Sequence, residues 1–371
     1  MRIRAARLEE LELRLVEPFE TSFGVEHRRR FLLLELEARG GEVGYGECAA
    51  ALEPLYSGET VGTAREVILR HLLPLVFDDE EVDAHRFLER AQRFRGNRMA
   101  KSAVETALVD LEGRERNRPV SALLGRGRSR VEVGVSVGIL PSIPQLVRRV
   151  GEYLDSGYRR IKLKVRPGWD VAPLRAVRAA YPDIELWVDG NQGYPVDQAP
   201  HIARWARRFR VAQVEQPFVE RAIGAHARLA RAAPFRVCLD ESVVDDASLD
   251  EALDARALSS LNVKTARVGG LFPSRDLARR ARARGAAAWV GGMLESGVGR
   301  AANVHLASQP EFTLPADLSA SDRYYAEDLI DPPFRLGPGS TLTVPRGAGL
   351  GVEVVEAAVR RARRRTTVRR G

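Results

Sequence analysis

The sequence predicts an α/β protein in which a (β/α) barrel follows an N-terminal α+β region. From residue 130 onward, short apolar or β-rich runs recur about every twenty-five residues, and an amphipathic helical pattern follows nearly all of them. Eight such runs fall within about 190 residues, which favours a closed barrel over an open sheet. The earlier residues show a different order, strands first and helices afterwards, which indicates a separate α+β unit.

The N-terminal region, residues 1–125, begins with a predicted meander of strands. The expected strands are 4–16, 30–38 and 42–47, and the expected helices are 59–75, 83–94 and 99–117. In the last helix, Met99, Ala103, Ala107 and Leu111 recur every four residues and form a stripe that we expect to face the core.

The barrel region, residues 126–330, contains the eight expected strands. They are 131–138, 161–165, 186–190, 211–216, 237–241, 261–264, 286–292 and 312–317. Little helical sequence follows the last run before Asp331-Pro332-Pro333, so we expect the eighth helix to be missing or displaced. Residues 340–356 are strand-like again, and we expect the segment 331–358 to pack back on the N-terminal region.

The composition is that of a soluble globular chain. Hydrophobic residues make up 44% of the 371 residues, and no apolar run approaches the ~18 residues that a membrane helix requires. The N-terminus lacks the apolar stretch of a secretory signal, so the cytoplasm is the expected location. Cys48 and Cys238 are too few for a disulfide framework, and the six histidines show no zinc-binding spacing.

The net charge of +8 comes mainly from the C-terminus, because seven arginines fall within residues 359–371. We expect this basic tail to be a solvated, disordered end, with a nonspecific polyanion contact as the alternative. The rest of the chain is nearly neutral and carries no recognisable nucleic-acid module, so no specific nucleic-acid partner is expected.

Lysine is nearly absent, and its positions are informative. Among the 58 basic residues, the four lysines are Lys101, Lys162, Lys164 and Lys264. On a solvated surface arginine replaces lysine easily, but only lysine can become a neutral amine near pH 7 and transfer a proton. The three lysines in predicted strands therefore indicate proton-transfer chemistry, against the alternative that their placement is accidental.

Three acidic residues follow consecutive predicted strands at nearly constant spacing. Asp189, Glu215 and Asp240 lie 26 and 25 residues apart, one strand–helix unit each. At the carboxyl ends of neighbouring strands they would converge, and their mutual repulsion would be costly without a cation. Mg²⁺ suits such oxygen ligands best, with Mn²⁺ next. Helix capping is a good alternative for any one of them but a poor one for all three.

Lys162 and Lys164 are two apart on one predicted strand, so their side chains share a face. The residues between and beside them are apolar and claim the helix layer, so both lysines should point into the barrel. Lowering a lysine pKa from about 10.4 to about 7.4 corresponds to about 4 kcal/mol, which nearby positive charges can supply. Lys264 would add an amine on the other face of a substrate. This arrangement suits removal of a proton α to a carboxylate, with the metal stabilising the enolate.

These residues match a known family. The chain resembles the enolase superfamily, in the branch with a lysine pair that contains the ortho-succinylbenzoate synthases and the N-succinylamino acid racemases. The matching segments are 18–24, 46–48, 161–164, 262–270, 291–297 and 319–324. The resemblance implies a modified (β/α)7β barrel under an N-terminal α+β capping domain, with loop 18–27 as a mobile lid and Gly24 as its hinge.

The resemblance also implies roles for individual residues. Asp189, Glu215 and Asp240 would bind the metal, Lys164 would be the acid/base group on one face with Lys264 facing it, and Lys162 would tune the pKa of Lys164. The expected substrate contacts are Phe19, Ser136, Asn191, Gly291, Gly292 and Met293. A helix cap is the alternative for Ser136 and Asn191, and a tight turn for the glycine pair. Gly190 and the pair Thr265-Ala266 depart from the family pattern and bear only on substrate preference.

Two activities follow from the resemblance. The leading expectation is metal-dependent syn-dehydration of 2-succinyl-6-hydroxy-2,4-cyclohexadiene-1-carboxylate to 2-succinylbenzoate, a step of menaquinone synthesis. The alternative is racemisation of N-succinyl or other N-acyl amino acids, in which Lys164 and Lys264 alternate as acid and base. Arg267 either modulates Lys264 in favour of racemisation or is a structural ion-pair residue. The expected partner is a small carboxylate substrate, and a homo-oligomer is expected although no pattern marks its interface.

Overall fold

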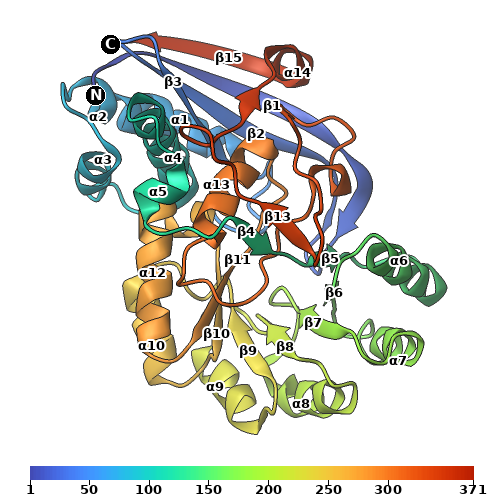
Figure 1. The fold of residues 1–371 in the computed structure, drawn as a ribbon. Helices are drawn as coiled ribbons and strands as arrows, with labels where there is room; N and C mark the ends of the chain where they lie inside the picture. Colours follow the sequence, from blue (N-terminus) through green and yellow to red (C-terminus); the bar gives the residue numbers. More distant parts are fainter.

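The N-terminal capping domain is built on a four-stranded antiparallel sheet with the order β15–β1–β2–β3. The computed structural model describes residues 1–371. The strands are β1 (Ile3–Glu20), β2 (Val25–Ala38), β3 (Val43–Cys48) and β15 (Arg363–Arg370). The sheet spans the top of the molecule in Figure 1, where both termini lie.

Helices cover one face of this sheet. They are α1 (Val61–Val67), a π-helical segment (Ile68–Leu72), α2 (Leu73–Phe77), α3 (Ala84–Ala91), α4 (Arg98–Glu115) and α5 (Val120–Leu124). Helix α4 packs directly on β3 because two glycines leave room for its backbone. A Cβ on Gly44 would lie 2.3 Å from the carbonyl oxygen of Ala107, and one on Gly46 would lie 1.9 Å from that of Ala103. The stripe predicted to face the core on α4, which includes Ala103 and Ala107, therefore makes a close helix–sheet contact.

Seven parallel strands form the curled sheet of the second domain, in the order β11–β10–β9–β8–β7–β6–β5. They are β5 (Val135–Val137), β6 (Arg160–Lys164), β7 (Glu185–Asp189), β8 (Gln213–Glu215), β9 (Arg236–Leu239), β10 (Ser260–Val263) and β11 (Ala287–Val290). Ala316 and Asp317 join its two edges, because Ala316 pairs with Val133 and Asp317 pairs with Gly291. This two-residue segment takes the place of an eighth strand and closes the predicted barrel.

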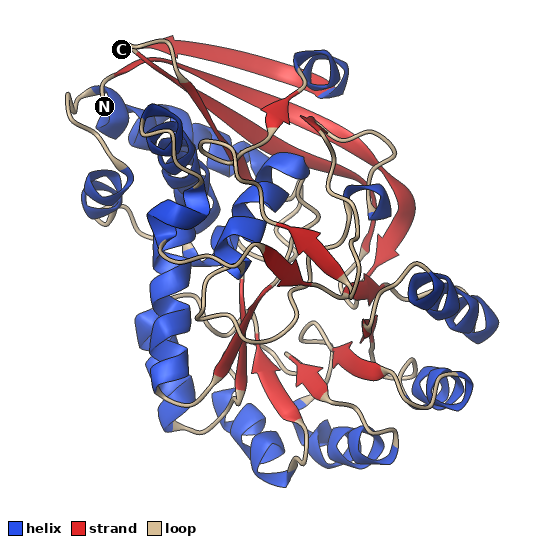
Figure 2. Cartoon of the chain, in the orientation of Figure 1, coloured by secondary structure: helices blue, strands red, loops and turns tan.

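Helices lie on the outer side of the barrel strands (Figures 1 and 2). They are α6 (Ile143–Asp155), α7 (Val171–Ala180), α8 (Ala199–Arg208), α9 (Ile223–Ala232), α10 (Asp246–Asp254), α12 (Leu271–Ala283) and α13 (Gly297–Ala307). Short helices also form in the connections, at α11 (Thr265–Val268), Val196–Gln198 and Ser321–Arg323. No α-helix lies between Asp317 and α14 (Glu356–Ala362), so the expected absence of an eighth barrel helix is confirmed.

The chain beyond the barrel returns to the capping domain. Its short strands pair as β12 (Ile330–Asp331) with β14 (Glu353–Val354), and β13 (Thr341–Thr343) with β4 (Arg130–Glu132). The backbone N–H of Leu350 donates to the buried carboxylate of Asp110 on α4 at 2.7 Å. This bond ties the returning segment to the capping domain.

Buried carboxylates also join the capping domain to the barrel helices. Glu105 on α4 accepts the backbone N–H groups of Leu271 and Phe272, both at 2.9 Å, where α12 begins. Glu47 in β3 accepts the N–H of Ser296 at 3.1 Å, at the N-terminus of α13. Burial raises the pKa of both Glu47 and Glu105 to about 7. Each carboxylate satisfies N–H groups that a helix start would otherwise leave without a partner.

The prediction of a disordered basic tail at 359–371 is wrong. Residues 363–370 form β15, which pairs antiparallel with β1 at the edge of the capping-domain sheet. Its arginines meet acidic groups of β1: Arg363 lies 2.8 Å from Glu9, and Arg364 lies 2.8 Å from Glu12. The charge of the segment by itself does not show that acidic side chains of β1 neutralise some of its arginines.

Three expected elements differ in extent. The loop expected at 18–27 is mostly strand, since β1 runs to Glu20 and β2 starts at Val25, which leaves a turn closed by a 2.9 Å bond from the N–H of Thr21 to the oxygen of Gly24. The run 131–138 divides into β4 and β5, and the run 312–317 contributes only its last two residues to the barrel.

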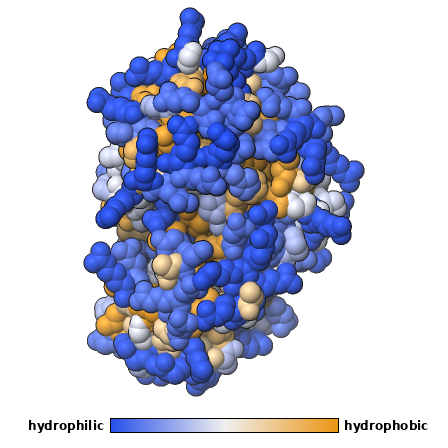
Figure 3. Space-filling model, turned by 90° about the vertical axis from the view of Figure 1, so that its left-hand side faces the viewer, coloured by the Kyte–Doolittle hydropathy of each residue, from blue (hydrophilic) through white to orange (hydrophobic).

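The surface shown in Figure 3 is mostly hydrophilic, with apolar residues in small separate groups. No helix of the structure has the length and apolar character needed to cross a membrane.

Candidate active site

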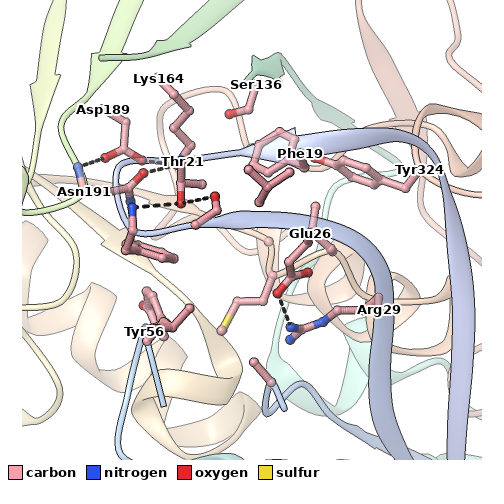
Figure 4. Close-up of a pocket in the computed structure, with 18 of the residues that line it drawn as sticks. Phe19, Thr21, Glu26, Arg29, Tyr56, Ser136, Lys164, Asp189, Asn191 and Tyr324 are labelled. Atoms are coloured by element: carbon pink, nitrogen blue, oxygen red, sulfur yellow. Dashed lines mark hydrogen bonds and ion pairs between the residues drawn. The ribbon is translucent and has the colours of Figure 1, made fainter. Parts of the chain in front are cut away.

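A cavity of about 300 Å³ lies where the carboxyl ends of the barrel strands face the capping domain. The barrel contributes side chains at the ends of β5, β6, β7 and β10, and the capping domain contributes the β1–β2 hairpin tip and residues 51–56. Figure 4 shows Lys164, Asp189 and Asn191 together on one side of the cavity and Tyr56 away from them. The cavity therefore joins the predicted strand-end site to the predicted lid region.

Lys162 on β6 is held by three carboxylates. Its Nζ lies 2.8 Å from Glu215, 2.9 Å from Asp317 and 3.7 Å from Asp189. Burial by itself would lower the pKa of Lys162, but these carboxylates, Asp317 foremost, raise it above its usual value. Lys162 is thus a fixed positive charge beside the cavity.

Lys164 and Lys264 approach the cavity from opposite walls. Their strands, β6 and β10, are four positions apart in a ring of seven strands and one bridging pair, so their ends face each other. The Nζ of Lys164 lies 2.6 Å from Asp189 and 2.7 Å from Oδ1 of Asn191. The Nζ of Lys264 lies 2.8 Å from Oδ2 of Asp240. Both amines line the cavity.

The three acidic residues stand at neighbouring strand ends. Asp189 and Glu215 are register partners, and Asp240 follows β9 directly. The amide of Asn262 links two of them, because its Nδ2 lies 2.6 Å from Glu215 and 3.2 Å from Asp240. Helix capping does not explain them, since the N-cap positions of the helices that follow, α8, α9 and α10, are occupied by Gln198, Ala222 and Asp245.

A divalent cation fits this donor set, although the side chains are not arranged around an ion as they stand. No three His, Cys, Asp or Glu side chains enclose a common point, because each carboxylate is paired with a lysine instead. Asp189, Glu215 and Asp240 are 1% exposed or less. Buried carboxylate oxygens crowded together are the ligands that Mg²⁺ and Mn²⁺ prefer. Ion binding here requires the lysine ammonium groups to withdraw from the oxygens.

The pKa values of two buried carboxylates are raised by burial and by repulsion between the acidic residues. Burial, followed by repulsion from Asp189, raises the pKa of Glu215 to about 7. Burial and repulsion from Asp240 raise the pKa of Glu241 to about 8, and neither oxygen of Glu241 has a hydrogen-bond partner. A bound cation would relieve this repulsion between the carboxylates.

The sequence predicted a lowered pKa within the Lys162–Lys164 pair, and the structure shows a raised pKa for Lys162. Burial would lower the pKa of Lys264, but Asp240, Tyr56 and Glu241 raise it well above its usual value, as the carboxylates do for Lys162. Each of these two amines lies within 2.9 Å of a carboxylate, a pairing that the spacing of the lysines along the chain does not reveal.

The structure places most of the expected substrate contacts at the cavity. Those that line it are Phe19, Ser136, Asn191, Gly292 and Met293. The Ser136 hydroxyl donates to Asp317 at 2.6 Å, and neither Ser136 nor Asn191 caps a helix. Gly291 is not part of the lining. A Cβ at Gly291 would lie 2.2 Å from Oδ1 of Asn262, so this glycine makes room for the asparagine that links two acidic residues.

Sequence reasoning missed two residues of the site. Asp317 ends the expected eighth strand, so the rule that found the other strand-end acids could have found it. Tyr56 lies in a capping-domain loop without any periodic signal, and only the fold brings it to Asp240, at 2.8 Å. Arg267, which the sequence left open, is ion-paired with Asp240 and donates to the backbone oxygen of Val243 at 2.8 Å.

The chain is similar to known proteins along nearly its whole length. Residues 3–125 match the family model "Mandelate racemase / muconate lactonizing enzyme, N-terminal domain", and residues 145–358 match "Enolase C-terminal domain-like". An N-succinylamino acid racemase of Amycolatopsis is 45% identical over 353 residues, and an o-succinylbenzoate synthase of Enterococcus faecalis is 37% identical over 352, each match covering 95% of both chains.

The solved structures agree with these matches. The crystal structure of an enolase superfamily member from Listeria innocua superposes with a TM-score of 0.94 at 34% identity, over 99% of each chain. The two family models and the superposition together cover both the capping domain and the barrel. This chain belongs to the enolase superfamily, in the family of the o-succinylbenzoate synthases and N-succinylamino acid racemases.

Proposed function

We propose that this protein is a metal-dependent o-succinylbenzoate synthase, which dehydrates 2-succinyl-6-hydroxy-2,4-cyclohexadiene-1-carboxylate to 2-succinylbenzoate. The observation that carries the proposal is the pair of amines, Lys164 and Lys264, on opposite walls of one cavity above three buried carboxylates. Relatives named o-succinylbenzoate synthase match 95% of the chain at 37% identity.

In this proposal Lys164 moves the proton. As a neutral amine it takes the proton α to the substrate carboxylate, and as an ammonium it returns that proton to the hydroxyl group that leaves as water from the same face. A divalent ion held by Asp189, Glu215 and Asp240, Mg²⁺ or else Mn²⁺, stabilises the enolate charge as a Lewis acid when bound. The Lys264 ammonium stabilises the same charge from the opposite wall.

Lys162 and Asp317 prepare Lys164 for this step. Lys162 is two residues away on the same strand face, and Asp317, which is not one of the proposed metal ligands, lies 2.9 Å from its Nζ and keeps it charged. In this proposal the Lys162 ammonium is the tuning partner of Lys164, because like charges on one strand face repel each other.

Racemisation of N-succinylamino acids is the second candidate, and one comparison favours it. Relatives at 45% and 42% identity are named N-succinylamino acid racemase. The same site would serve, with Lys164 removing the α-proton from one face and Lys264 supplying a proton to the other. Because both routes need the same strand ends, one enzyme can carry both activities.

A side-by-side assay of both substrates tests the proposal. With Mg²⁺ or Mn²⁺ we expect dehydration, with or without racemisation, and with a chelator neither. The Lys264→Arg variant keeps a cation without a usable base, so it should lose racemisation and keep part of the dehydration. If dehydration disappeared as completely as racemisation, the assignment of Lys164 as the sole base of the dehydration would be wrong; turnover of neither substrate by the metal-loaded wild type would contradict the proposal.

The setting follows from the same proposal. We place the enzyme in menaquinone synthesis in the cytoplasm, acting as a homo-oligomer on a small carboxylate, without a membrane or a specific nucleic-acid partner. A noncatalytic polyanion-binding role is the remaining alternative for the arginines of 359–371. Truncation after Val359 separates the two roles: full turnover with lost DNA retention leaves the segment an accessory, whereas a protein that is inert and indifferent to metal favours polyanion binding.

A further inference from the structure

Residues 51–60 of the capping domain form a loop that is fixed at both ends and reaches the cavity. The N–H of Val61 donates to the oxygen of Ala51 at 2.8 Å, which closes the loop. Next to this closure, Glu59 accepts the N–H groups of Met99 and Ala100 at 2.9 and 3.1 Å and so anchors the loop to α4. The residues of this loop that line the cavity are Ala51, Leu52, Glu53, Leu55 and Tyr56.

Tyr56 carries this loop into the catalytic machinery. Its hydroxyl donates to Oδ1 of Asp240 at 2.8 Å and accepts from Arg267 at 3.3 Å. The centre of its ring lies 4.4 Å from the Nζ of Lys264. Among the hydrogen bonds of the structure, it is the single one that runs from a capping-domain side chain to Asp189, Glu215 or Asp240.

The two oxygens of Asp240 have different surroundings. Oδ2 receives Lys264 at 2.8 Å and Asn262 at 3.2 Å, and the same Asn262 amide bonds to Glu215, so Oδ2 faces the other acidic residues. Oδ1 is held from the far side by Tyr56 and Arg267. The far-side bonds therefore set the rotation of the carboxylate and with it the direction in which Oδ2 points.

We propose that Tyr56 is a positioning residue that couples the closed state of loop 51–60 to the orientation of Asp240 and the placement of Lys264. When the loop withdraws, Asp240 loses a bond that fixes its rotation and Lys264 loses the aromatic face beside it. The coupling is reciprocal, because a ligand that needs the fixed Asp240 also favours the closed loop. This inference rests on the metal-binding part of the proposed function.

Two substitutions separate the contributions of the hydroxyl and the ring. Tyr56→Phe removes the bond to Asp240 and keeps the ring over Lys264, whereas Tyr56→Leu removes both. Tyr181→Phe is the matched control, because the Tyr181 hydroxyl donates to the backbone of Val147 at 3.2 Å on the helix layer of the barrel. Mn²⁺ binding to each full-length variant is measured by calorimetry without substrate, and hydrogen exchange of 51–60 is followed with and without Mn²⁺.

We expect Tyr56→Phe to weaken Mn²⁺ binding about tenfold, the lower end of the loss seen when a partner of a metal ligand is removed. Its kcat should fall while KM changes little, and Mn²⁺ should slow exchange in 51–60 of the wild type and of Tyr181→Phe but not of Tyr56→Phe. Tyr56→Leu should lose more kcat than Tyr56→Phe.

If Tyr56→Phe binds Mn²⁺ within twofold of the wild type and Mn²⁺ slows hydrogen exchange of its loop equally, the inference is overturned and the proposed function stands. A wild type that binds no Mn²⁺ overturns both. Because Tyr56→Phe keeps the size of the ring, its unfolding midpoint should match that of the control; if Tyr56→Leu fails to fold, Tyr56→Phe alone decides.

Discussion

Replacing Asp317 by asparagine should destabilise the protein more than an ordinary change of one charge. The Asp317 carboxylate lies 2.9 Å from Lys162 and 3.1 Å from Arg160, and it accepts the Ser136 hydroxyl at 2.6 Å. Lys162 and Arg160 are only 3% and 1% exposed. The substitution would therefore leave two buried cations with one fewer counter-charge.

The size of the effect follows from these contacts. Removing one partner of a buried ion pair costs about 3–5 kcal/mol, because the remaining charge is left without compensation. The asparagine oxygen can still accept from Ser136, and Lys162 keeps Glu215 at 2.8 Å. We therefore expect a loss near the lower end, about 3 kcal/mol, in the free energy of unfolding.

Urea unfolding followed by circular dichroism measures this loss, with Asp322→Asn as the control. Asp322 pairs with Arg335 at 2.9 Å, but both side chains are more than 60% exposed, and such a pair contributes about 0–1 kcal/mol. An Asp317→Asn variant within about 1 kcal/mol of that control would refute the reasoning that the buried charge cluster depends on Asp317.

Three further predictions follow from other parts of the fold. The native pKa of Glu105 is about 7 against 4.5 unfolded, so the native state binds this proton more tightly. This group therefore raises the free energy of unfolding as the pH falls from 7 to 4.5, by up to about 1.4 kcal/mol per pH unit. Glu105→Gln should remove this pH dependence from unfolding curves measured at several pH values. A Gly46→Ala variant should unfold at lower denaturant than the wild type, because its Cβ would lie 1.9 Å from the Ala103 oxygen; an unchanged midpoint would mean that α4 shifts freely. Truncation after Val359 should lower the melting temperature, because it removes β15 and its contacts with β1; equal melting would show that β15 adds no stability.

The sequence predicted the barrel, its missing helix and the strand-end residues because these follow from local rules. Apolar runs at regular spacing give parallel strands, and parallel strands bring Lys162, Lys164 and the acidic residues to one edge. The same rule reaches Asp317 only once the eighth strand is recognised as a two-residue bridge.

Other features depend on contacts that no local pattern records. Tyr56 reaches Asp240 across 184 positions of the chain, and β15 became a strand because β1 offers an unpaired edge with acidic side chains. The raised pKa of Lys162 also differs from the prediction, because it depends on which carboxylates the amine meets. Long-range pairing and charge balance are properties of the assembled fold and not of a sequence window.

The central claim is that Lys164 and Lys264 face the substrate from opposite walls of the cavity. Its most direct test is the exchange of the substrate α-proton with deuterium from the solvent. Each enantiomer of N-succinylphenylalanine is incubated in deuterated water with the Mg²⁺-loaded wild type, Lys164→Arg or Lys264→Arg. The α-proton signal is followed by nuclear magnetic resonance. We predict that the wild type exchanges both enantiomers, that each variant loses exchange of one enantiomer, and that the two variants lose opposite ones. If either variant still exchanged both enantiomers at the wild-type rate, the two amines would not face the substrate from opposite walls.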